Sequence, residues 1–360
     1  MQVIKEIREN GYARIEGELG IKVKRAGGYV LLDYCQINSP KLDPIVKECR
    51  GLILDEETLD VACRSFDRFF NYGEGDAQNL DFRGCKVVEK VDGSLIRVWY
   101  DYKQGMWQVA TRGMIFADST VMGNDFTFRE LFIRVFNKNF VTGNSEENFQ
   151  DLCHLLFFMD ETYIFELATA YNRVVTRYEK ETIKLLGVRD NLEGYYIDTD
   201  QYTQFEQPEW YSIGSFEECI KASQELGGLK EGFVVIDHNR VPVCKIKSPA
   251  YVAVHHIRGE GLNPKRISQL VWSGEADEYL TYFPEDRHII EPYMTKRIEV
   301  EAAIAKLWLA TMLIEGQKEF ALEVKDTPYA GVLFNARKGV LLGDCVAMTN
   351  DKIKQDWLGL

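Results

Sequence analysis

Several features that would assign a chain to a membrane or to secretion are missing from this sequence. No run of apolar residues approaches the roughly 20 that a membrane-spanning helix needs. The first residues, Met1 to Glu6, lack the basic and then apolar order of a secretion signal. The sequence also contains no internal repeat and no low-complexity tract. We therefore expect a globular protein without a membrane segment.

Paired cysteines are absent as well. The eight cysteines stand singly, and none forms a Cys-x-x-Cys pair. This spacing suits neither a zinc site nor a disulfide framework, and it is typical of free thiols in a reducing compartment. We therefore expect a cytoplasmic protein. The cysteines are Cys35, Cys49, Cys63, Cys85, Cys153, Cys219, Cys244 and Cys345.

Basic residues are fewer than acidic residues in this sequence. The chain has 43 Lys and Arg against 56 Asp and Glu, which gives a net charge of −13 at pH 7. That balance argues against broad, sequence-blind binding to nucleic acid. It leaves room for a local basic cleft, because a site that holds a phosphorylated substrate needs cations only there.

The length of 360 residues is sufficient for two domains, and a hydrophobic content of 46% supports well-packed cores. Strand and helix patterns alternate up to about residue 250, and strand patterns then disappear. We predict a mixed α+β domain over residues 1–250 and an all-α domain over residues 251–360. Predicted strands cover 29–34, 50–55, 87–90, 95–99, 107–113, 163–167, 183–189, 231–236 and 243–247; predicted helices cover 127–139, 152–158 and 216–226.

In the helical region, five apolar residues recur at three- and four-residue spacing, which predicts one face of a long helix. They are Ile298, Ala302, Ala305, Leu309 and Met312.

The segment Lys90-Val91-Asp92-Gly93-Ser94 separates two runs of apolar and β-branched residues. This pattern predicts two strands joined by a tight Asp-Gly turn, that is, a β-hairpin. Lys90 would then stand at the end of the first strand, with its direction fixed by rigid backbone. An ordinary hairpin with a solvated lysine is the alternative.

Seven charged residues lie within or at the ends of predicted strands. One such residue alone is commonly a structural ion pair, because burying an unpaired charge is costly. Seven in one domain indicate a cleft lined with both signs of charge. Its cations suit a triphosphate, and its glutamates suit a ribose or a metal ion held through water. The seven are Arg50, Lys90, Arg112, Glu166, Glu231, Lys245 and Lys247.

Lys90 to Ser94 resembles motif I, Lys-x-Asp-Gly-(Ser/Thr), of the covalent nucleotidyltransferases, which include RNA ligases, DNA ligases and capping enzymes. The other motifs follow in the family's order: 165–166 resembles motif III, 185–189 motif IIIa, 231–234 motif IV and 245–247 motif V. The segments 48–52, 69–71 and 169–175 resemble the RNA ligase 1 family of the T-even phage type. Arg68 departs from that family, which has a lysine there. The resemblance covers roughly residues 40–250.

The resemblance implies a nucleotidyltransferase (ATP-grasp-like ligase) domain of antiparallel sheets with flanking helices. It implies an ATP-dependent RNA ligase that joins 5′-phosphate and 3′-hydroxyl ends through lysyl-AMP and RNA-adenylate intermediates. The expected setting is RNA repair, with a tRNA anticodon loop as one substrate, in the cytoplasm of the host if a phage encodes the chain. ATP and Mg²⁺, with Mn²⁺ as an alternative, are the implied cofactors, and the enzyme is expected to be a monomer. The helical domain matches no motif of the family, so whether it selects the RNA stays open.

Individual roles follow from the same resemblance. Lys90 is implied to be the nucleophile, Glu166 to bind the ribose hydroxyls, and Glu231 to hold the metal through water. We expect Lys245, Lys247 and the metal to lower the pKa of Lys90, since nearby cations disfavour its charged form. The residues assigned to ATP or AMP are Arg50, Arg68, Glu89, Glu166, Lys245 and Lys247, and those assigned to support are Asp92, Gly93 and Gly232.

In this interpretation Asp92 and Gly93 shape the turn that presents Lys90, with the glycine supplying a backbone conformation that other residues resist.

Rival functions stay open. DNA ligation and GTP-dependent capping belong to the same superfamily, but those enzymes usually carry an oligonucleotide-binding β-barrel after motif V, where this chain has helices. A non-catalytic RNA-binding relative is the rival from another class. Arg173 and Arg177 fit either RNA phosphates or ordinary ion pairs, and Trp272, Trp308 and Trp357 fit core packing better than base stacking. Phe66, Phe69 and Phe70 are predicted core residues.

Overall fold

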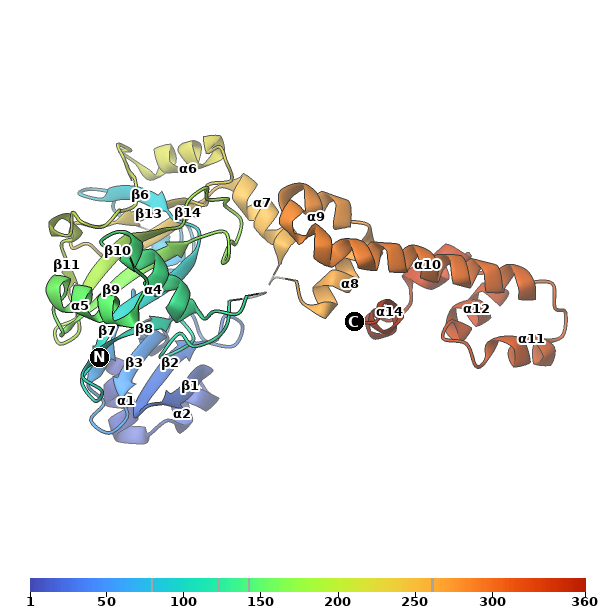
Figure 1. The fold of residues 1–360 in the computed structure, drawn as a ribbon, viewed down its shortest axis with the longest axis horizontal. Coiled ribbons are helices and arrows are strands. Elements are labelled where there is room, and N and C mark those ends of the chain that lie inside the picture. The colour runs from blue at the N-terminus through green and yellow to red at the C-terminus, as the bar shows by residue number, and fades with distance from the viewer. Residues whose placement is uncertain (79, 122–123, 142, 260–261) are drawn as a thin grey trace. The chain divides into compact units, whose positions relative to one another are not determined.

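The computed structural model describes residues 1–78, 80–121, 124–141, 143–259 and 262–360. The chain divides into two compact units, Met1–Ala253 and Val254–Leu360 (Figure 1). The first unit contains three β-sheets, and the second is helical. The boundary lies within α7 (Pro249–Arg258), the helix that also contains the predicted boundary after residue 250.

The first unit opens with a four-stranded antiparallel sheet in the order β1-β2-β3-β4. Val30, Leu32 and Leu52 from its strands pack with Val3 and Ile15 from two N-terminal helices. The sequence does not predict β1, because cationic residues interrupt its apolar pattern. The elements are α1 (Gln2–Asn10), α2 (Ala13–Gly17), β1 (Ile21–Ala26), β2 (Tyr29–Tyr34), α3 (Pro44–Glu48), β3 (Arg50–Asp55) and β4 (Val61–Cys63).

A five-stranded antiparallel sheet, here called the β9 sheet, has the order β11-β10-β9-β7-β8. Phe132 and Phe136 lie one turn apart on α4 and pack against Phe165 of β9, so an aromatic core joins the helix to the sheet. The elements are β7 (Ser94–Asp101), β8 (Met106–Thr111), α4 (Phe128–Lys138), α5 (Glu146–Leu156), β9 (Glu161–Ala168), β10 (Thr182–Asp190), β11 (Tyr196–Ile197) and the 3₁₀ helix η2 (Thr199–Gln201).

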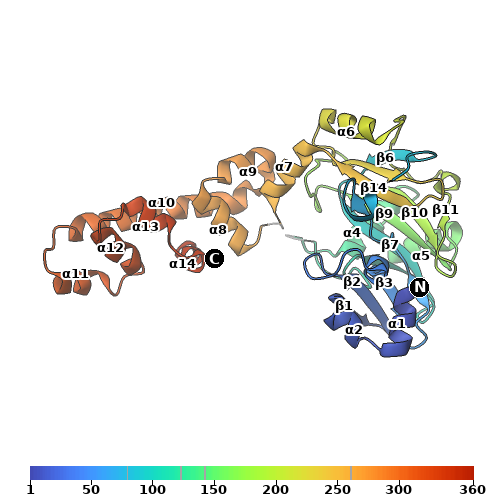
Figure 2. The same ribbon diagram turned by 180° about the vertical axis from the view of Figure 1, so that it is seen from behind.

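A second five-stranded sheet, here called the β13 sheet, has the order β12-β6-β13-β14-β5. Strands β14 and β5 run parallel, with Cys244 opposite Phe70, so this edge departs from the predicted antiparallel arrangement. Helix α6 packs on the sheet through Phe216 and Cys219 (Figures 1 and 2). The elements are β5 (Phe70–Asn71), η1 (Gly75–Ala77), β6 (Lys86–Lys90), β12 (Trp210–Tyr211), α6 (Phe216–Glu225), β13 (Gly232–Ile236) and β14 (Pro242–Lys247).

The predicted hairpin around Asp92 is wrong. Strand β6, which ends at Lys90, pairs with β13 and β12, whereas β7, which begins at Ser94, pairs with β8 and β9. Residues 91–93 therefore carry the chain from one sheet to the other. Gly93 does not have a positive φ, so it does not supply an unusual turn conformation.

The second unit is built from short helices and one long helix, α10. Val300 and Ile304 of α10 pack with Phe320, Leu333 and Trp357 in one core. No helix in the described part of the chain is both long enough and apolar enough to span a bilayer. The elements are α8 (Pro264–Ser273), α9 (Ala276–Tyr282), η3 (Pro284–Asp286), α10 (Arg287–Thr311), α11 (Gln317–Val324), α12 (Ala330–Arg337), α13 (Leu342–Ala347) and α14 (Asp351–Leu358).

The predicted long helix exists as α10, but the face that carries the five apolar residues is not the buried one. Ile298 and Leu309 are 67% and 69% exposed, and Met312, just past the helix, is also exposed. The buried residues Val300 and Ile304 lie on a different stripe of the helix. Apolar spacing alone did not separate the two stripes, because both carry apolar residues at helical intervals.

Candidate active site

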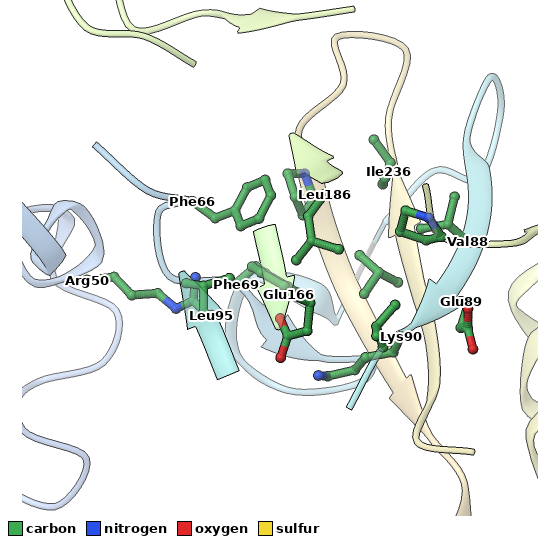
Figure 3. A pocket seen from close by; sticks show the side chains of 14 residues that line it. Arg50, Phe66, Phe69, Val88, Glu89, Lys90, Leu95, Glu166, Leu186 and Ile236 are labelled. Atoms are coloured by element: carbon green, nitrogen blue, oxygen red, sulfur yellow. The ribbon is translucent and has the colours of Figure 1, made fainter. Parts of the chain in front are cut away.

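A pocket opens between the β13 sheet and the β9 sheet, and its wall is largely apolar. Val88 and Val234 from the β13 sheet face Leu95 and Leu186 from the β9 sheet. Figure 3 shows Lys90 and Glu166 directed toward the same space, with Glu89 pointing away from both. The other lining residues are Arg50, Phe66, Phe69, Glu89, Lys90, Val91, Glu166, Pro208, Ile236 and Pro242.

Lys90 stands at the end of β6, opposite Gly232 at the start of β13. Its Nζ donates a hydrogen bond of 2.7 Å to Oε2 of Glu231. Burial lowers the pKa of Lys90, but Glu231, Glu166 and Asp92 outweigh burial and raise it overall. The expectation that neighbouring lysines lower the pKa of Lys90 is therefore wrong, because the neighbouring carboxylates outweigh them.

Glu231 is buried and binds two lysines. Its Oε1 accepts from Nζ of Lys247 at 2.9 Å, while Oε2 accepts from Lys90. Burial raises the pKa of Glu231, but the two lysines outweigh burial and hold that pKa below its usual value. Residues 1–78, 80–121, 124–141, 143–259 and 262–360 contain no cluster of three or more His, Cys, Asp and Glu side chains arranged to hold a metal. A buried carboxylate such as Glu231 is of the type that can hold a hydrated Mg²⁺ through water, but both of its oxygens are bonded to lysines.

Glu166 lies in the middle of β9 and is only 9% exposed. Burial raises the pKa of its carboxyl group to about 8, an effect that Lys90 opposes and Glu231 reinforces. The side chain is consequently protonated to a large extent at neutral pH.

Lys245 differs from Lys90 in the direction of its pKa shift. Burial, assisted by the charges of Lys90, Arg50 and Lys247, lowers the pKa of Lys245 to about 8. Its Nζ lies 5.5 Å from the ring centre of Phe69. Phe69 is only partly buried and lines the pocket, so it is not the core residue that the sequence predicts, whereas Phe66 and Phe70 are buried.

Two arginines leave buried donors unsatisfied; Arg50 lines the pocket, and Arg68 directly precedes the lining residue Phe69. Nη1 of Arg50, and Nε and Nη1 of Arg68, have no hydrogen-bond partner in the part of the chain that the structure describes. The guanidinium of Arg68 stacks on Tyr34 and Phe70 at 4.5 and 5.0 Å from the ring centres. Unpaired buried donors are costly in a folded protein, and guanidinium groups in this state suit an anion such as a phosphate.

Arg112 and Glu89 are already paired. Arg112 donates from Nε to Oδ1 of Asp33 at 2.8 Å, and Lys184 donates to Oε2 of Glu89 at 2.6 Å. A nucleotide contact by Glu89, as the sequence predicts, has to compete with that ion pair.

Asp92 joins three segments and does not form a turn. Its Oδ2 accepts from the backbone N–H groups of Val175 and Thr176 at 2.8 and 2.7 Å, and its Oδ1 accepts from the Tyr251 hydroxyl at 2.7 Å. Its own N–H donates to the hydroxyl of Tyr178 at 3.1 Å. Neither tyrosine was predicted from the sequence, because no local pattern connects them to Asp92.

The two glycines assigned to support are required by close packing. A Cβ on Gly93 would overlap the carbonyl oxygen of Leu167 and lie 3.2 Å from Cγ of Glu166. Gly232 has a φ of +140°, and a Cβ there would overlap the carbonyl oxygen of Ile246. Both positions therefore hold the strands of the site at a spacing that only glycine permits.

Comparison with known proteins agrees with this geometry. The chain is 32% identical over 351 residues to a protein of Autographa californica nuclear polyhedrosis virus that is named as a bifunctional polynucleotide kinase/RNA ligase. That alignment covers 94% of this chain but 50% of the viral protein, so the chain spans about half of its length. An RNA ligase of Rhodothermus phage RM378 is 24% identical over 378 residues, which covers 80% of this chain and 78% of the phage protein.

Among solved structures, an archaeal ATP-dependent RNA ligase aligns with a TM-score of 0.45 at 13% identity, over 94% of this chain and 81% of its own. The model of the family described as RNA ligase matches residues 48–251, which include every charged residue of the pocket. Since that match covers more than half of the 360 residues, the chain belongs to the RNA ligase family.

Proposed function

We propose that the protein is an ATP-dependent RNA ligase of the nucleotidyltransferase fold and that Lys90 is its nucleophile. The observation that carries this proposal is the position of Lys90. Its amine stands where the two sheets meet and is bonded to Glu231, and Lys90 lines an apolar pocket together with Glu166.

In the first step, Nζ of Lys90 attacks the α-phosphorus of ATP, an N–P bond forms, and pyrophosphate leaves. Only the neutral amine is nucleophilic. Because the ion pair with Glu231 raises the pKa of Lys90, the amine must separate from Glu231 and lose its proton before it attacks. A divalent ion bound with ATP would compete for the carboxylate of Glu231 and so would weaken this ion pair.

The pocket and the side chains beside it have suitable groups for each part of ATP, although Lys245, Lys247 and Arg68 are not among the residues that line the pocket. Val88, Val234 and Leu186 provide an apolar slot for adenine, and the protonated carboxyl of Glu166 can both donate to and accept from ribose hydroxyls. Lys245 and Lys247 hold the α-phosphate. The unsatisfied guanidinium donors hold the outer phosphates.

Mg²⁺ is the proposed metal, with Mn²⁺ as a substitute. Such an ion neutralises phosphate charge and stabilises the pyrophosphate leaving group. Glu231 would hold it through water, once its lysine partners turn to the α-phosphate.

In the later steps, AMP passes from Lys90 to the 5′-phosphate of an RNA, and a 3′-hydroxyl then displaces AMP to seal the strand. We propose RNA repair as the setting, in a reducing cytoplasm that suits eight free cysteines, and in a host cytoplasm if a phage encodes the chain. The helical unit Val254–Leu360 is the proposed module that selects the RNA, with a tRNA anticodon loop as one candidate.

Incubation with ATP labelled at the α-phosphate and Mg²⁺ tests the proposal. We expect a covalent adduct that pyrophosphate reverses, that forms with ATP and not with GTP, and that is discharged by 5′-phosphorylated RNA with sealing of the strand. The absence of an adduct, or discharge only by nicked DNA, would contradict an RNA ligase.

The lowered pKa of Lys245 predicts how ATP binding depends on pH. Phosphate binding requires the charged lysine, so above pH 8 it must take up a proton. We expect the affinity for an ATP analogue with a non-cleavable α,β bridge to fall about tenfold between pH 7 and pH 9. Lys245→Arg should show a clearly smaller fall over the same range, because arginine stays charged and, of the side chains at positions 245 and 166, only the Glu166 carboxyl still titrates there. Equal slopes for the two proteins would refute this assignment.

A further inference from the structure

The loop of residues 169–178, between β9 and β10, is attached firmly to the segment that carries Lys90. Asn172 donates from Nδ2 to Oγ of Ser94 at 2.9 Å and to the carbonyl oxygen of Leu167 at 2.7 Å. Its Oδ1 accepts from the N–H and the hydroxyl of Thr169. The amide of Asn172 therefore fixes the first half of the loop.

The second half of the same loop is fixed by Asp92, which accepts from the N–H groups of Val175 and Thr176. Thr176 also donates from Oγ1 to the carbonyl oxygen of Leu229 at 2.9 Å. The loop is thus held on both sides of Arg173. Its exposed side chains therefore keep a constant position relative to Lys90.

What the loop exposes is an aromatic ring. Tyr171 is 44% exposed, and the guanidinium carbon of Arg134 on α4 lies 5.0 Å from its ring centre. Arg134 lies equally close to Phe126, whose ring meets that of Tyr171 edge to face at 5.2 Å. Glu181 accepts from Nη2 of Arg134 at 2.8 Å and fixes the cation.

We propose that Tyr171 is a stacking platform for an unpaired base of the RNA strand near its reacting end. This inference rests on the proposed ligase function and deepens it. Exposed aromatic rings bind single-stranded nucleic acid through base stacking. Arg134 holds the ring from one side, which leaves the exposed part for a base, and the exposed Arg177 on the same loop supplies a cation for the RNA backbone.

The ring does not serve the ATP pocket, whose wall consists of other residues. The ring of Tyr171 is also more exposed than a packing role requires. A residue that only joined α4 to the loop would be buried between them. A rigid loop is the support that a precise binding site needs.

The test separates RNA binding from the reaction with ATP. For Tyr171→Ala we expect lysyl-AMP formation from ATP alone at the wild-type rate, because that step involves no RNA. Binding of 5′-phosphorylated single-stranded RNA by the adenylylated enzyme should weaken about tenfold, the effect typical of one lost base stack. Tyr171→Phe should bind RNA as the wild type does, because the ring remains.

Tyr102→Ala is the matched control. This tyrosine is 61% exposed and follows the end of β7 opposite to Ser94, so its loss should leave RNA binding unchanged. Any of three results would overturn the platform. They are wild-type RNA affinity in Tyr171→Ala, equal weakening of RNA binding in Tyr171→Phe, and joint loss of adduct formation and thermal stability in Tyr171→Ala. Failure of the wild-type protein to form any adduct would instead count against the ligase proposal itself.

Discussion

Lys90→Ala is expected to abolish the transfer of labelled AMP from ATP to the protein. The variant lacks the one lysine that lines the apolar pocket within the described residues, and with it the amine bonded to Oε2 of Glu231. A neighbouring lysine is a poor substitute, because Lys247 is bonded to Glu231 through the other carboxylate oxygen and Lys245 lies against Phe69. The measurement is label retained by the denatured protein.

Two further variants separate the nucleophile from the ion pair. Lys90→Arg keeps a cation beside Glu231 but stays protonated, so we expect normal thermal stability and no adduct. Lys86→Ala changes a lysine at the other end of β6 that is 66% exposed, and it should form adduct as the wild type does. An adduct that persists in Lys90→Ala would remove Lys90 from the mechanism.

The strands that carry the charged residues were largely predictable from the sequence. The predicted strands at 163–167, 183–189, 231–236 and 243–247 correspond to β9, β10, β13 and β14 with ends that differ by a few residues. Apolar and β-branched runs bounded by polar residues specify such buried strands locally. The local sequence pattern also predicted the helices α4 and α6.

Which strands pair with each other was not predictable. The segment around Asp92 looked like a hairpin, but the partner of β6 is β13, about 140 residues further along the chain. The prediction of the direction of the pKa shift of Lys90 was wrong for the same reason. It depends on the carboxylate of Glu231, which only the paired strands bring to 2.7 Å. The contacts of Asp92 with Tyr178 and Tyr251 are likewise tertiary.

Gly93→Ala is the second change with a large expected effect. Gly93 links Lys90 to β7, and β7 pairs with β9 so that Ser94 lies opposite Leu167. An added methyl group would overlap the carbonyl oxygen of Leu167, a backbone atom that cannot turn aside. The segment must then move away from β9, and Lys90 must move relative to Glu166. Since a misplacement of about 1 Å can cost about a hundredfold in rate, we expect adduct formation at least about a hundredfold slower.

The comparison with Gly113→Ala makes this prediction specific. Gly113 also lacks a positive φ, but its nearest neighbour to an added methyl group is Nζ of Lys24 at 3.8 Å, an ordinary contact. Both variants lose the same backbone freedom, so a difference between them reports the close approach to Leu167. If Gly93→Ala were to form adduct at the rate of Gly113→Ala, tight packing of the Lys90 segment on β9 would not be what positions the nucleophile. If it is slow yet unfolds at a similar temperature, geometry within the site accounts for the loss, because the fold itself has been retained.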